Sequence, residues 1–330
     1  MKPATFNPPP WLRNPHLQSV LATSGLRKWH ARHVAATLQR DARELILDGG
    51  QGVRLQGFLT CQDRLPQPRA LVALLHGWEG RIDSNYLLYT GARLLDAGFD
   101  VFRLHFRDHG DTHALNPELF HSCRIDEVVH AISDLAARVP HTRLCVAGFS
   151  LGGNFALRVA LRASKAGIEL HHAAAVCPVI DPRAGLEAIE SAPWFYQQYF
   201  VRKWGRSLRR KQQLFPDRYH FNAADLHTSL RELTRTLVER HTDFENLDAY
   251  LDGYSIAGDR LASLSVPVSI LTAADDPIIP VADFHHLQLP PDASLQIVPH
   301  GGHCGFIEGS DLRSYAEDWI TEHLTQACAH

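Results

Sequence analysis

From residue 43 onward, short apolar runs alternate along the chain with stretches whose apolar residues recur at helical spacing. Continuous apolar runs of about four to eight residues are typical of buried strands, and the helical spacing is typical of amphipathic helices. Their alternation predicts an α/β fold with a mostly parallel sheet covered by helices on both faces. The predicted strands are 44–47, 53–60, 70–75, 100–106, 143–149, 173–178, 266–273 and 294–298, and the predicted helices are 85–97, 125–137, 151–163 and 312–324.

Two segments depart from this alternation. The first two predicted strands are separated by Asp48-Gly49-Gly50-Gln51-Gly52, which predicts an antiparallel hairpin before the parallel sheet. Residues 182–258 are rich in aromatic and charged side chains and are predicted to be helical. We expect a single domain over 1–330 with 182–258 inserted as a helical cap over the strand ends, where open α/β sheets bind ligands. The alternative is a packing subdomain with no contact to substrate.

Composition and charge narrow the classes of function. The chain has 330 residues, of which 45% are hydrophobic and 21% charged, so it is expected to fold throughout. With 33 basic and 36 acidic residues the net charge is −3, so the chain lacks the overall excess of positive charge that is typical of nucleic-acid-binding proteins. Basic residues cluster only at Arg202, Lys203, Arg206, Arg209, Arg210 and Lys211, which we expect to form a solvated helix face.

The cysteines and the N-terminus bear on the compartment. Six scattered cysteines contain no C-x-x-C pair, and several lie in apolar runs, so a disulfide framework is disfavoured and a reducing cytoplasm is favoured. The first residues lack the apolar stretch of a signal peptide, and no run approaches the ~20 apolar residues that span a bilayer. We expect a soluble, cytoplasmic protein without stable membrane insertion.

The strongest chemical motif is Gly148-Phe149-Ser150-Leu151-Gly152, a G-x-S-x-G sequence between a predicted strand and a predicted helix. A turn from strand to helix within one residue strains the backbone at Ser150, and glycines on either side relieve crowding. The turn would present the serine oxygen at a helix N-terminus, where the Leu151 amide can bind developing negative charge. Ser150 is therefore the candidate nucleophile.

A serine nucleophile needs a histidine base and an acid that orients it, and in this chain order both follow the serine. Asp276 ends a predicted strand just before Pro277 and is the preferred acid, with Asp275 as the alternative. His303 follows two glycines after the last predicted strand and is the preferred base, with His300 as the rival. The remaining histidines show no metal-binding spacing, so neither a metal nor a cofactor is expected.

The second half of an oxyanion hole should lie in the loop after the first long parallel strand. That loop begins His76-Gly77-Trp78, and Gly77 permits close approach of the backbone. We expect the amides of Trp78 and Leu151 to point together at a substrate carbonyl oxygen.

Four segments together resemble the YheT-like branch of the α/β-hydrolases, and the resemblance covers most of the chain. It implies an α/β-hydrolase fold and a Ser-Asp-His hydrolase of short-chain esters or acylglycerols without a cofactor, with these roles on Ser150, Asp276 and His303 by motif position. The segments are Arg13-Asn14-Pro15-His16-Leu17-Gln18-Ser19, His76-Gly77-Trp78-Glu79-Gly80, Leu104-His105-Phe106-Arg107 with His121-Ser122, and Gly148-Phe149-Ser150-Leu151-Gly152-Gly153-Asn154.

Two departures from that branch bear on the substrate. Trp78 replaces an aliphatic residue, and Asp108-His109 stands where the branch more often has a Gly-Cys or Gly-His pair. We expect both to narrow the acyl pocket. The segment around Asn14 is expected only to pack an N-terminal arm against the core.

The sequence thus predicts a serine hydrolase that cleaves short- to medium-chain carboxylic esters or acylglycerols through an acyl-enzyme, with a small-molecule ester as its partner. One alternative is an acyltransferase with the same triad, favoured if an aromatic cap excludes water. Another is a binder of apolar ligands without catalysis, because a fold alone does not fix function. The oligomeric state stays open.

Overall fold

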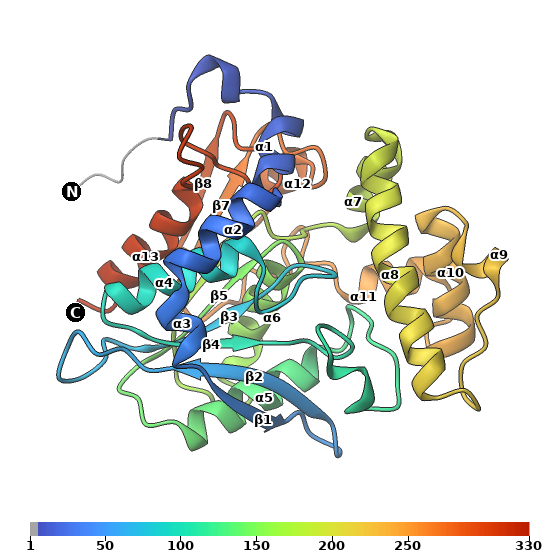
Figure 1. Ribbon diagram of the computed structural model, residues 1–330, viewed down its shortest axis with the longest axis horizontal. Helices are drawn as coiled ribbons and strands as arrows, with labels where there is room; N and C mark the ends of the chain where they lie inside the picture. Colours follow the sequence, from blue (N-terminus) through green and yellow to red (C-terminus); the bar gives the residue numbers. More distant parts are fainter. Residues whose placement is uncertain (1–5, 330) are drawn as a thin grey trace.

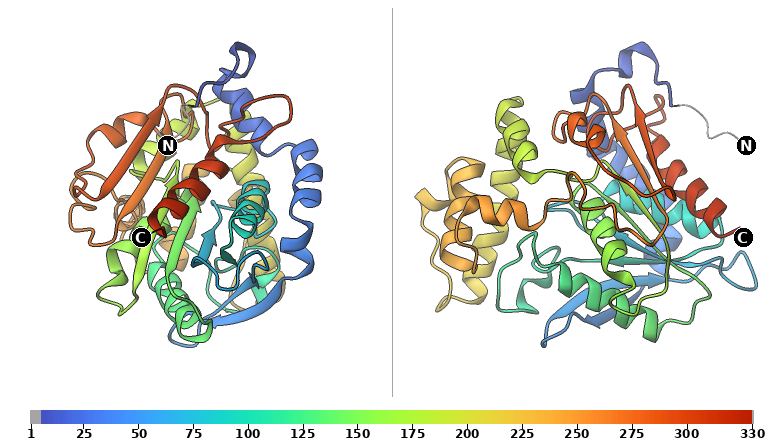
Figure 2. Two further views of the ribbon diagram at one scale, coloured as in Figure 1. Left: turned by 90° about the vertical axis from the view of Figure 1, so that its left-hand side faces the viewer. Right: turned by 180° about the vertical axis from the view of Figure 1, so that it is seen from behind.

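The computed structural model describes residues 6–329 and contains one eight-stranded sheet with helices on both faces (Figures 1 and 2). The strand order is β1-β2-β4-β3-β5-β6-β7-β8. β1 and β2 form the predicted hairpin, β2 is also antiparallel to β4, and the remaining pairs are parallel. The strands are β1 Arg43–Asp48, β2 Arg54–Thr60, β3 Leu71–Leu75, β4 Asp100–Leu104, β5 Leu144–Phe149, β6 Leu170–Val176, β7 Val268–Ala273 and β8 Ala293–Val298.

The central strands are buried on both faces, as their continuous apolar sequences predict. In β3, Leu71, Ala73 and Leu75 pack toward α5 (Ile125–Arg138) and α6 (Leu151–Ala163). Val72 and Leu74 pack on the opposite side with α4 (Asn85–Asp96) and α13 (Tyr315–Ala327). The predicted mostly parallel sheet with two covered faces is confirmed.

Residues 182–258 hold five helices between β6 and β7, which stand apart from the sheet on the right of Figure 1. Their place beside the carboxyl ends of the strands is the place that a cap would occupy, and the cap assignment itself stays a prediction. The helices are α7 Pro182–Ser191, α8 Trp194–Leu214, α9 Ala223–Leu226, α10 Leu230–His241 and α11 Leu247–Gly253. The short α12 (Val281–His285) follows β7.

The N-terminal segment is helical, which its apolar pattern does not reveal. A 3₁₀ turn and three helices precede β1: η1 Pro10–Leu12, α1 Pro15–Ala22, α2 Gly25–Val34 and α3 Ala36–Arg40. α2 buries only Arg27 and Ala31, so its apolar stripe is too narrow to be detected by periodicity. Asn14 caps α1 by accepting from the amides of His16 and Leu17.

A buried ion pair fixes this arm to the rest of the chain. The Arg27 side chain is fully buried, donates to the carbonyls of Ala22 and Leu312, and pairs with Glu317 of α13. Its guanidinium also lies 4.6 Å from the ring centroid of Tyr89. Burial raises the pKa of Glu317 to about 7, with Arg27 opposing that shift. The N- and C-terminal helices are therefore held together by one desolvated charge pair.

We expect Arg27→Met to lower the free energy of unfolding by about 3–5 kcal/mol, because it leaves Glu317 buried without its partner. The matched control is Arg40→Met, which removes an exposed arginine from its pair with Asp41 and should leave stability nearly unchanged. Denaturant unfolding measures both. Equal losses in the two variants would contradict the role assigned to the buried pair.

Candidate active site

Ser150 lies at the turn between β5 and α6 with φ 54° and ψ −121°, a conformation that L residues rarely adopt. The turn is so tight that positions 148 and 152 have no room for a side chain. A Cβ at Gly148 would lie 2.1 Å from the Gly152 carbonyl oxygen, and one at Gly152 would lie 2.3 Å from the Leu75 carbonyl oxygen. The strain predicted for the G-x-S-x-G turn is therefore present, and the turn exposes the Ser150 hydroxyl at the start of α6.

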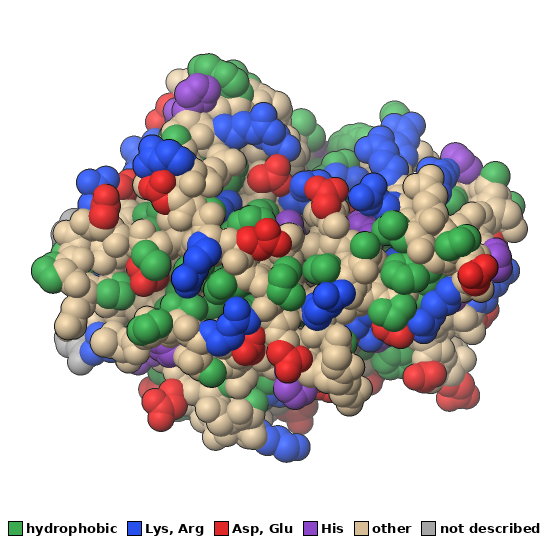
Figure 3. Space-filling view, turned by 60° about the horizontal axis from the view of Figure 1, so that its bottom comes forward, with side chains coloured by type: hydrophobic (Ala, Val, Ile, Leu, Met, Phe, Trp, Pro, Cys, Tyr) green, Lys and Arg blue, Asp and Glu red, His purple; other side chains and the backbone are tan. Residues whose placement is uncertain are grey.

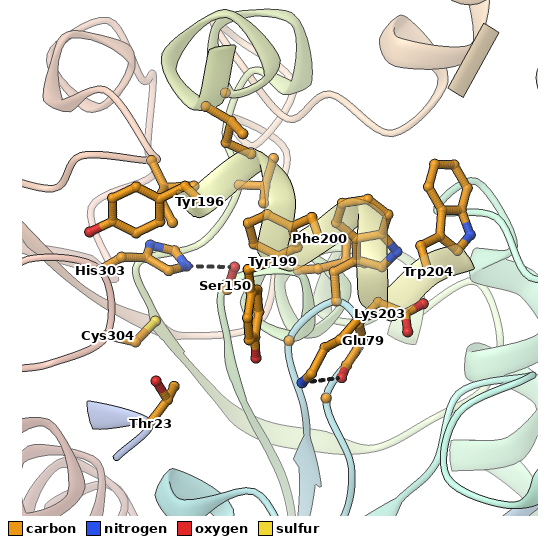
Figure 4. A pocket seen from close by; sticks show the side chains of 18 of the residues that line it. Thr23, Glu79, Ser150, Tyr196, Tyr199, Phe200, Lys203, Trp204, His303 and Cys304 are labelled. Atoms are coloured by element: carbon orange, nitrogen blue, oxygen red, sulfur yellow. Dashed lines mark hydrogen bonds between the residues drawn. The ribbon is translucent and has the colours of Figure 1, made fainter. Parts of the chain in front are cut away.

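The three predicted polar residues meet in one hydrogen-bonded chain. His303 Nε2 lies 2.9 Å from Ser150 Oγ, and His303 Nδ1 lies 2.9 Å from Asp276 Oδ2 (Figure 4 shows the first of these bonds). The other oxygen of Asp276 accepts from the amides of Ile278 and Ile279 at 2.8 and 3.0 Å. The carboxylate is fully buried and fixed on both sides, so it can hold the imidazole in one orientation.

The two rival residues pair with each other instead. His300 Nδ1 lies 3.4 Å from Asp275 Oδ2, and Asp275 Oδ1 accepts from the Gly302 amide at 2.9 Å. This pair lies beside the loop that carries His303 and does not bond to Ser150. The geometry therefore favours Asp276 and His303 over Asp275 and His300 as partners of the serine.

The N-terminal arm holds the same loop, and our expectation that it only packs against the core was incomplete. Ser19 Oγ accepts from the His303 amide at 2.9 Å and donates to the Pro15 carbonyl at 2.7 Å. The buried Gln18 amide donates to Leu12 and Ile307 carbonyls and accepts from the Ile307 amide at 2.6 Å. The Gln-Ser pair of the N-terminal signature thus binds the backbone at His303 and at Ile307, four residues later.

The electrostatics around His303 favour a positive charge on its ring. Burial by itself lowers the pKa of His303, but the Asp276 carboxylate and the neighbouring Cys304 together outweigh burial and raise the pKa well above 6.5. Burial raises the pKa of the neighbouring Cys304 thiol, but the Cys177 thiol and the charge on His303 outweigh burial and lower that pKa overall. The site stabilises imidazolium, which is the state a histidine reaches after taking a proton from a serine.

The loop after β3 lies against Ser150. A Cβ at Gly77 would lie 3.3 Å from the Ser150 Cβ, and the Gly77 amide donates to Tyr86 Oη at 2.9 Å. Trp78 and Leu151 line the same cavity as Ser150 and His303. Neither the Trp78 nor the Leu151 amide donates to another protein group within residues 6–329. Neither amide is therefore committed to a protein acceptor, and the role of both in an oxyanion hole stays a prediction.

Three buried histidines support this loop. His76 Nδ1 lies 2.7 Å from the Gly77 carbonyl, His109 Nε2 accepts from the Glu79 amide at 3.2 Å, and His105 Nε2 accepts from the Ile82 amide at 3.1 Å. Burial lowers the pKa of His105 to about 4 and that of His109 to about 3, and it holds the pKa of His76 well below 6.5. Three neutral imidazoles therefore fix the loop without adding charge beside the oxyanion position.

A cavity of about 770 Å³ extends from Ser150 beneath α8. Figure 4 shows Tyr196, Tyr199, Phe200 and Trp204 of α8 on the side facing Ser150 and His303. Trp78 stacks on Phe200 with centroids 5.1 Å apart and meets Trp204 edge-on at 5.0 Å. Side chains of α8 therefore line the cavity that contains the candidate nucleophile.

Glu79 is a cavity residue that the sequence did not single out. Burial raises the pKa of its carboxyl to about 7, against the opposing charge of Lys203, whose ammonium donates to the Glu79 carbonyl oxygen at 3.1 Å (Figure 4). The only sequence signal was its place in the His-Gly-Trp-Glu-Gly loop. Burial thus favours the protonated form of this carboxyl, as expected for an acidic side chain in a mostly apolar cavity.

Two expectations were wrong. Asp108 and His109 do not line the cavity, so they do not narrow it. Asp108 instead receives a 2.6 Å bond from Lys211, which we expected on a solvated helix face but which is fully buried. Lys211 also donates to the Asn116 carbonyl at 2.6 Å, so α8 is tied to the segment after β4. Burial of an unpaired charge is costly, and this partner explains why the lysine lies inside.

One group of side chains has the chemistry of a metal site. Ligand atoms of Cys177, His303 and Cys304 lie within 4.8 Å of one another. Both nitrogens of His303 already face Asp276 and Ser150, so a metal ion here would take the imidazole away from the serine. The group therefore offers no metal assistance to chemistry at Ser150.

Comparison with known proteins agrees with this geometry. Residues 72–314 match the alpha/beta hydrolase family over most of the chain. The chain belongs to that family. Its curated relatives include "Putative esterase YheT" of Escherichia coli, 27% identical over 283 residues and covering 78% of each chain. "Putative esterase slr0264" of Synechocystis is 23% identical over 335 residues, covering 94% of this chain and 89% of the relative.

The solved structures of alpha/beta hydrolases include the esterase Pf2001 of Pyrococcus furiosus, which aligns with a TM-score of 0.57 at 16% identity over 90% of this chain and 94% of that one. The α/β-hydrolase fold and the YheT-like branch predicted from sequence are thus confirmed. The relatives support a hydrolase. Among the described residues, no helix is long and apolar enough to cross a bilayer.

We expect Ser19→Ala to reduce kcat about tenfold to a hundredfold with little change in KM, because the His303 backbone loses a fixed partner and small displacements of a reacting group cost rate. The matched control is Thr321→Val, which removes a similar hydroxyl bond to the carbonyl four residues earlier, far from Ser150. Thermal unfolding of both variants separates positioning from stability. A kcat unchanged in Ser19→Ala would exclude the positioning role.

Proposed function

We propose that this alpha/beta hydrolase is a serine esterase that cleaves carboxylic esters through an acyl-enzyme on Ser150. The observation that carries the proposal is the unbroken chain of two 2.9 Å bonds from Asp276 through His303 to Ser150 at the end of an apolar cavity. A serine, an oriented imidazole and two available amides are together the parts that acyl transfer requires.

In the proposed reaction, Ser150 Oγ attacks the ester carbonyl carbon while His303 Nε2 takes the serine proton. The Trp78 and Leu151 amides bind the resulting oxyanion, each contributing about 3 kcal/mol to its stabilisation. His303 then returns the proton to the departing alcohol, and the acyl group stays on Ser150. Water, activated by His303, attacks the acyl carbonyl and releases the acid, with Asp276 holding the ring throughout.

The cavity supports an apolar acyl group as the substrate class. Its volume of about 770 Å³ lies in the range of small-molecule sites. Its walls are mainly aliphatic and aromatic, with contributions from Phe149, Leu186, Ile189, Phe200, Trp204 and Ile278. Short- to medium-chain acyl esters or acylglycerols fit such walls better than charged substrates do.

Acyl transfer to an alcohol is the alternative with the same triad. It requires exclusion of water from the acyl-enzyme. Trp194 and Tyr199 line the cavity yet are 72% and 43% exposed, so the cavity opens to solvent along α8. This opening favours hydrolysis.

We expect the folded protein to hydrolyse p-nitrophenyl esters, and Ser150→Ala to reduce kcat by about a thousandfold or more, as loss of a triad member does. Turnover of a series from acetate to palmitate, with and without the substitution, measures both the mechanism and the length of the acyl pocket. Turnover that survives in Ser150→Ala would refute the serine mechanism. No turnover by the folded protein would favour acyl transfer or ligand binding.

The acid assignment predicts a pH dependence. The base must be neutral to act, and Asp276 raises the pKa of His303 well above 6.5, so kcat/KM should rise with pH through a midpoint above that value. Asp276→Asn removes the carboxylate, so it should move the midpoint to lower pH and reduce kcat by about 10⁴-fold. Asp275→Asn is the matched control and should keep the midpoint. A shift of the midpoint in Asp275→Asn alone would reverse the assignment.

A further inference from the structure

Three arginines of α8, Arg202, Arg206 and Arg209, belong to a surface patch that has no part in the ion pairs of the fold or in the proposed chemistry. Along α8, exposed side chains follow one stripe at spacings of four and three residues: Phe195, Tyr199, Arg202, Arg206 and Arg209. Trp194 beside this stripe is 72% exposed, the largest exposure of any large hydrophobic side chain described. The solvent-facing side of α8 thus changes from aromatic to cationic along its length.

The arginines of the stripe have no acidic partner. Within residues 6–329, none of Arg202, Arg206 and Arg209 lies within ion-pair distance of a carboxylate. Exposed arginines elsewhere, such as Arg64, Arg138 and Arg260, do pair with aspartates. α8 contains no Asp or Glu in its 21 residues, although the whole chain has a net charge of −3. Positive charge is therefore concentrated here and left available.

The stripe borders the mouth of the cavity that leads to Ser150. Trp194, Tyr199, Arg202 and Arg206 line that cavity, and so does Val20 of α1 on the opposite rim. Val20 is 50% exposed, and Leu17, one turn earlier on the same helix, is 36% exposed. The two rims touch where His16 Nδ1 lies 3.2 Å from Tyr196 Oη. Figure 3 shows basic and hydrophobic side chains side by side toward the upper right, over the region of α8.

We call this set the rim patch: Leu17, Val20, Trp194, Phe195, Tyr199, Arg202, Arg206 and Arg209. We propose that the rim patch docks on an anionic phospholipid bilayer, with its aromatic and aliphatic side chains at the headgroup boundary and its arginines on lipid phosphates. Tryptophan and tyrosine favour that boundary because one end of each ring is apolar and the other polar. A cationic helix with an apolar side binds such surfaces because it buries apolar area in them and because its positive charges attract anionic lipids.

Charge distinguishes between two candidate partners of the rim patch, an anionic bilayer and a second copy of this chain. A two-fold contact places the same patch of two copies face to face. That contact would bring six unpaired arginines together without carboxylates from the patch to balance them. A bilayer with anionic headgroups supplies the missing negative charge. Docking would let acyl esters pass from the lipid into the cavity, and this part of the inference rests on the proposed function. The docking itself does not.

The test measures sedimentation of the full chain carrying Ser150→Ala with vesicles of phosphatidylcholine alone or mixed with phosphatidylglycerol. This variant lets binding be measured whether or not the protein hydrolyses lipid. We expect binding to the mixed vesicles, weakening with salt, and much less binding to phosphatidylcholine. Each arginine near an anionic surface contributes about fivefold to the affinity. The triple variant Arg202→Gln/Arg206→Gln/Arg209→Gln should therefore bind about a hundredfold more weakly.

The matched control is Arg40→Gln/Arg64→Gln/Arg138→Gln, which removes three exposed arginines outside the patch and should bind like the parent. Trp194→Ser/Tyr199→Ser should also weaken binding, while Leu65→Ser, at a hydrophobic side chain 37% exposed elsewhere, should not. Circular dichroism confirms that each variant is folded.

Three results would overturn the proposal. One is no binding of the parent to either vesicle, and another is equal weakening by the patch triple and the control triple. The third is a dimer in size-exclusion chromatography that Trp194→Ser/Tyr199→Ser converts to a monomer, which would assign the patch to a second copy. Hydrolysis of p-nitrophenyl esters is measured separately, so failure of docking and failure of the esterase proposal are distinguishable.

Discussion

The orientation of one imidazole ring is the constraint on which the site depends. His303 has to face Ser150 and Asp276 at the same time, with 2.9 Å to each. Ser150 is fixed by a strained strand-to-helix turn and Asp276 by two backbone amides. His303 lies on a loop, and the backbone of a loop is less rigid than that of a strand or helix. Contacts from Ser19 and Asp275 to that loop supply the missing rigidity.

Burial decides the charges around this ring. The loop after β3 is held by histidines that burial keeps neutral, so these side chains add no charge beside the proposed oxyanion position. Next to Ser150, the Asp276 carboxylate has the opposite effect and favours a charged His303. The same type of side chain is thus neutral where it supports the backbone and readily charged where we propose that it takes a proton.

The helices of residues 182–258 connect this chemistry to solvent. Lys211 fixes α8 to the segment after β4 through its buried pair with Asp108, while Phe200 and Trp204 meet Trp78 beside Ser150. The exposed stripe of α8 beside these rings is cationic, and its Arg202 and Arg206 border the same cavity. One helix therefore forms part of the cavity wall with one face and offers a surface beside the cavity mouth with another.

The sequence by itself determined the alternation of strands and helices, the hairpin and the strand-to-helix turn at Ser150, because hydrophobic periodicity and glycine requirements are local properties. It did not reveal α1–α3, since their buried stripe is narrow. Only the tertiary structure decided between Asp275 and Asp276 and between His300 and His303. The bonds concerned join residues 27, 153 and 284 positions apart. Neighbouring carboxylates look alike along a chain and differ only in what folding places opposite them. Lys211 shows the same limit: its cluster is uniformly basic in sequence, and packing alone selects which lysine is buried.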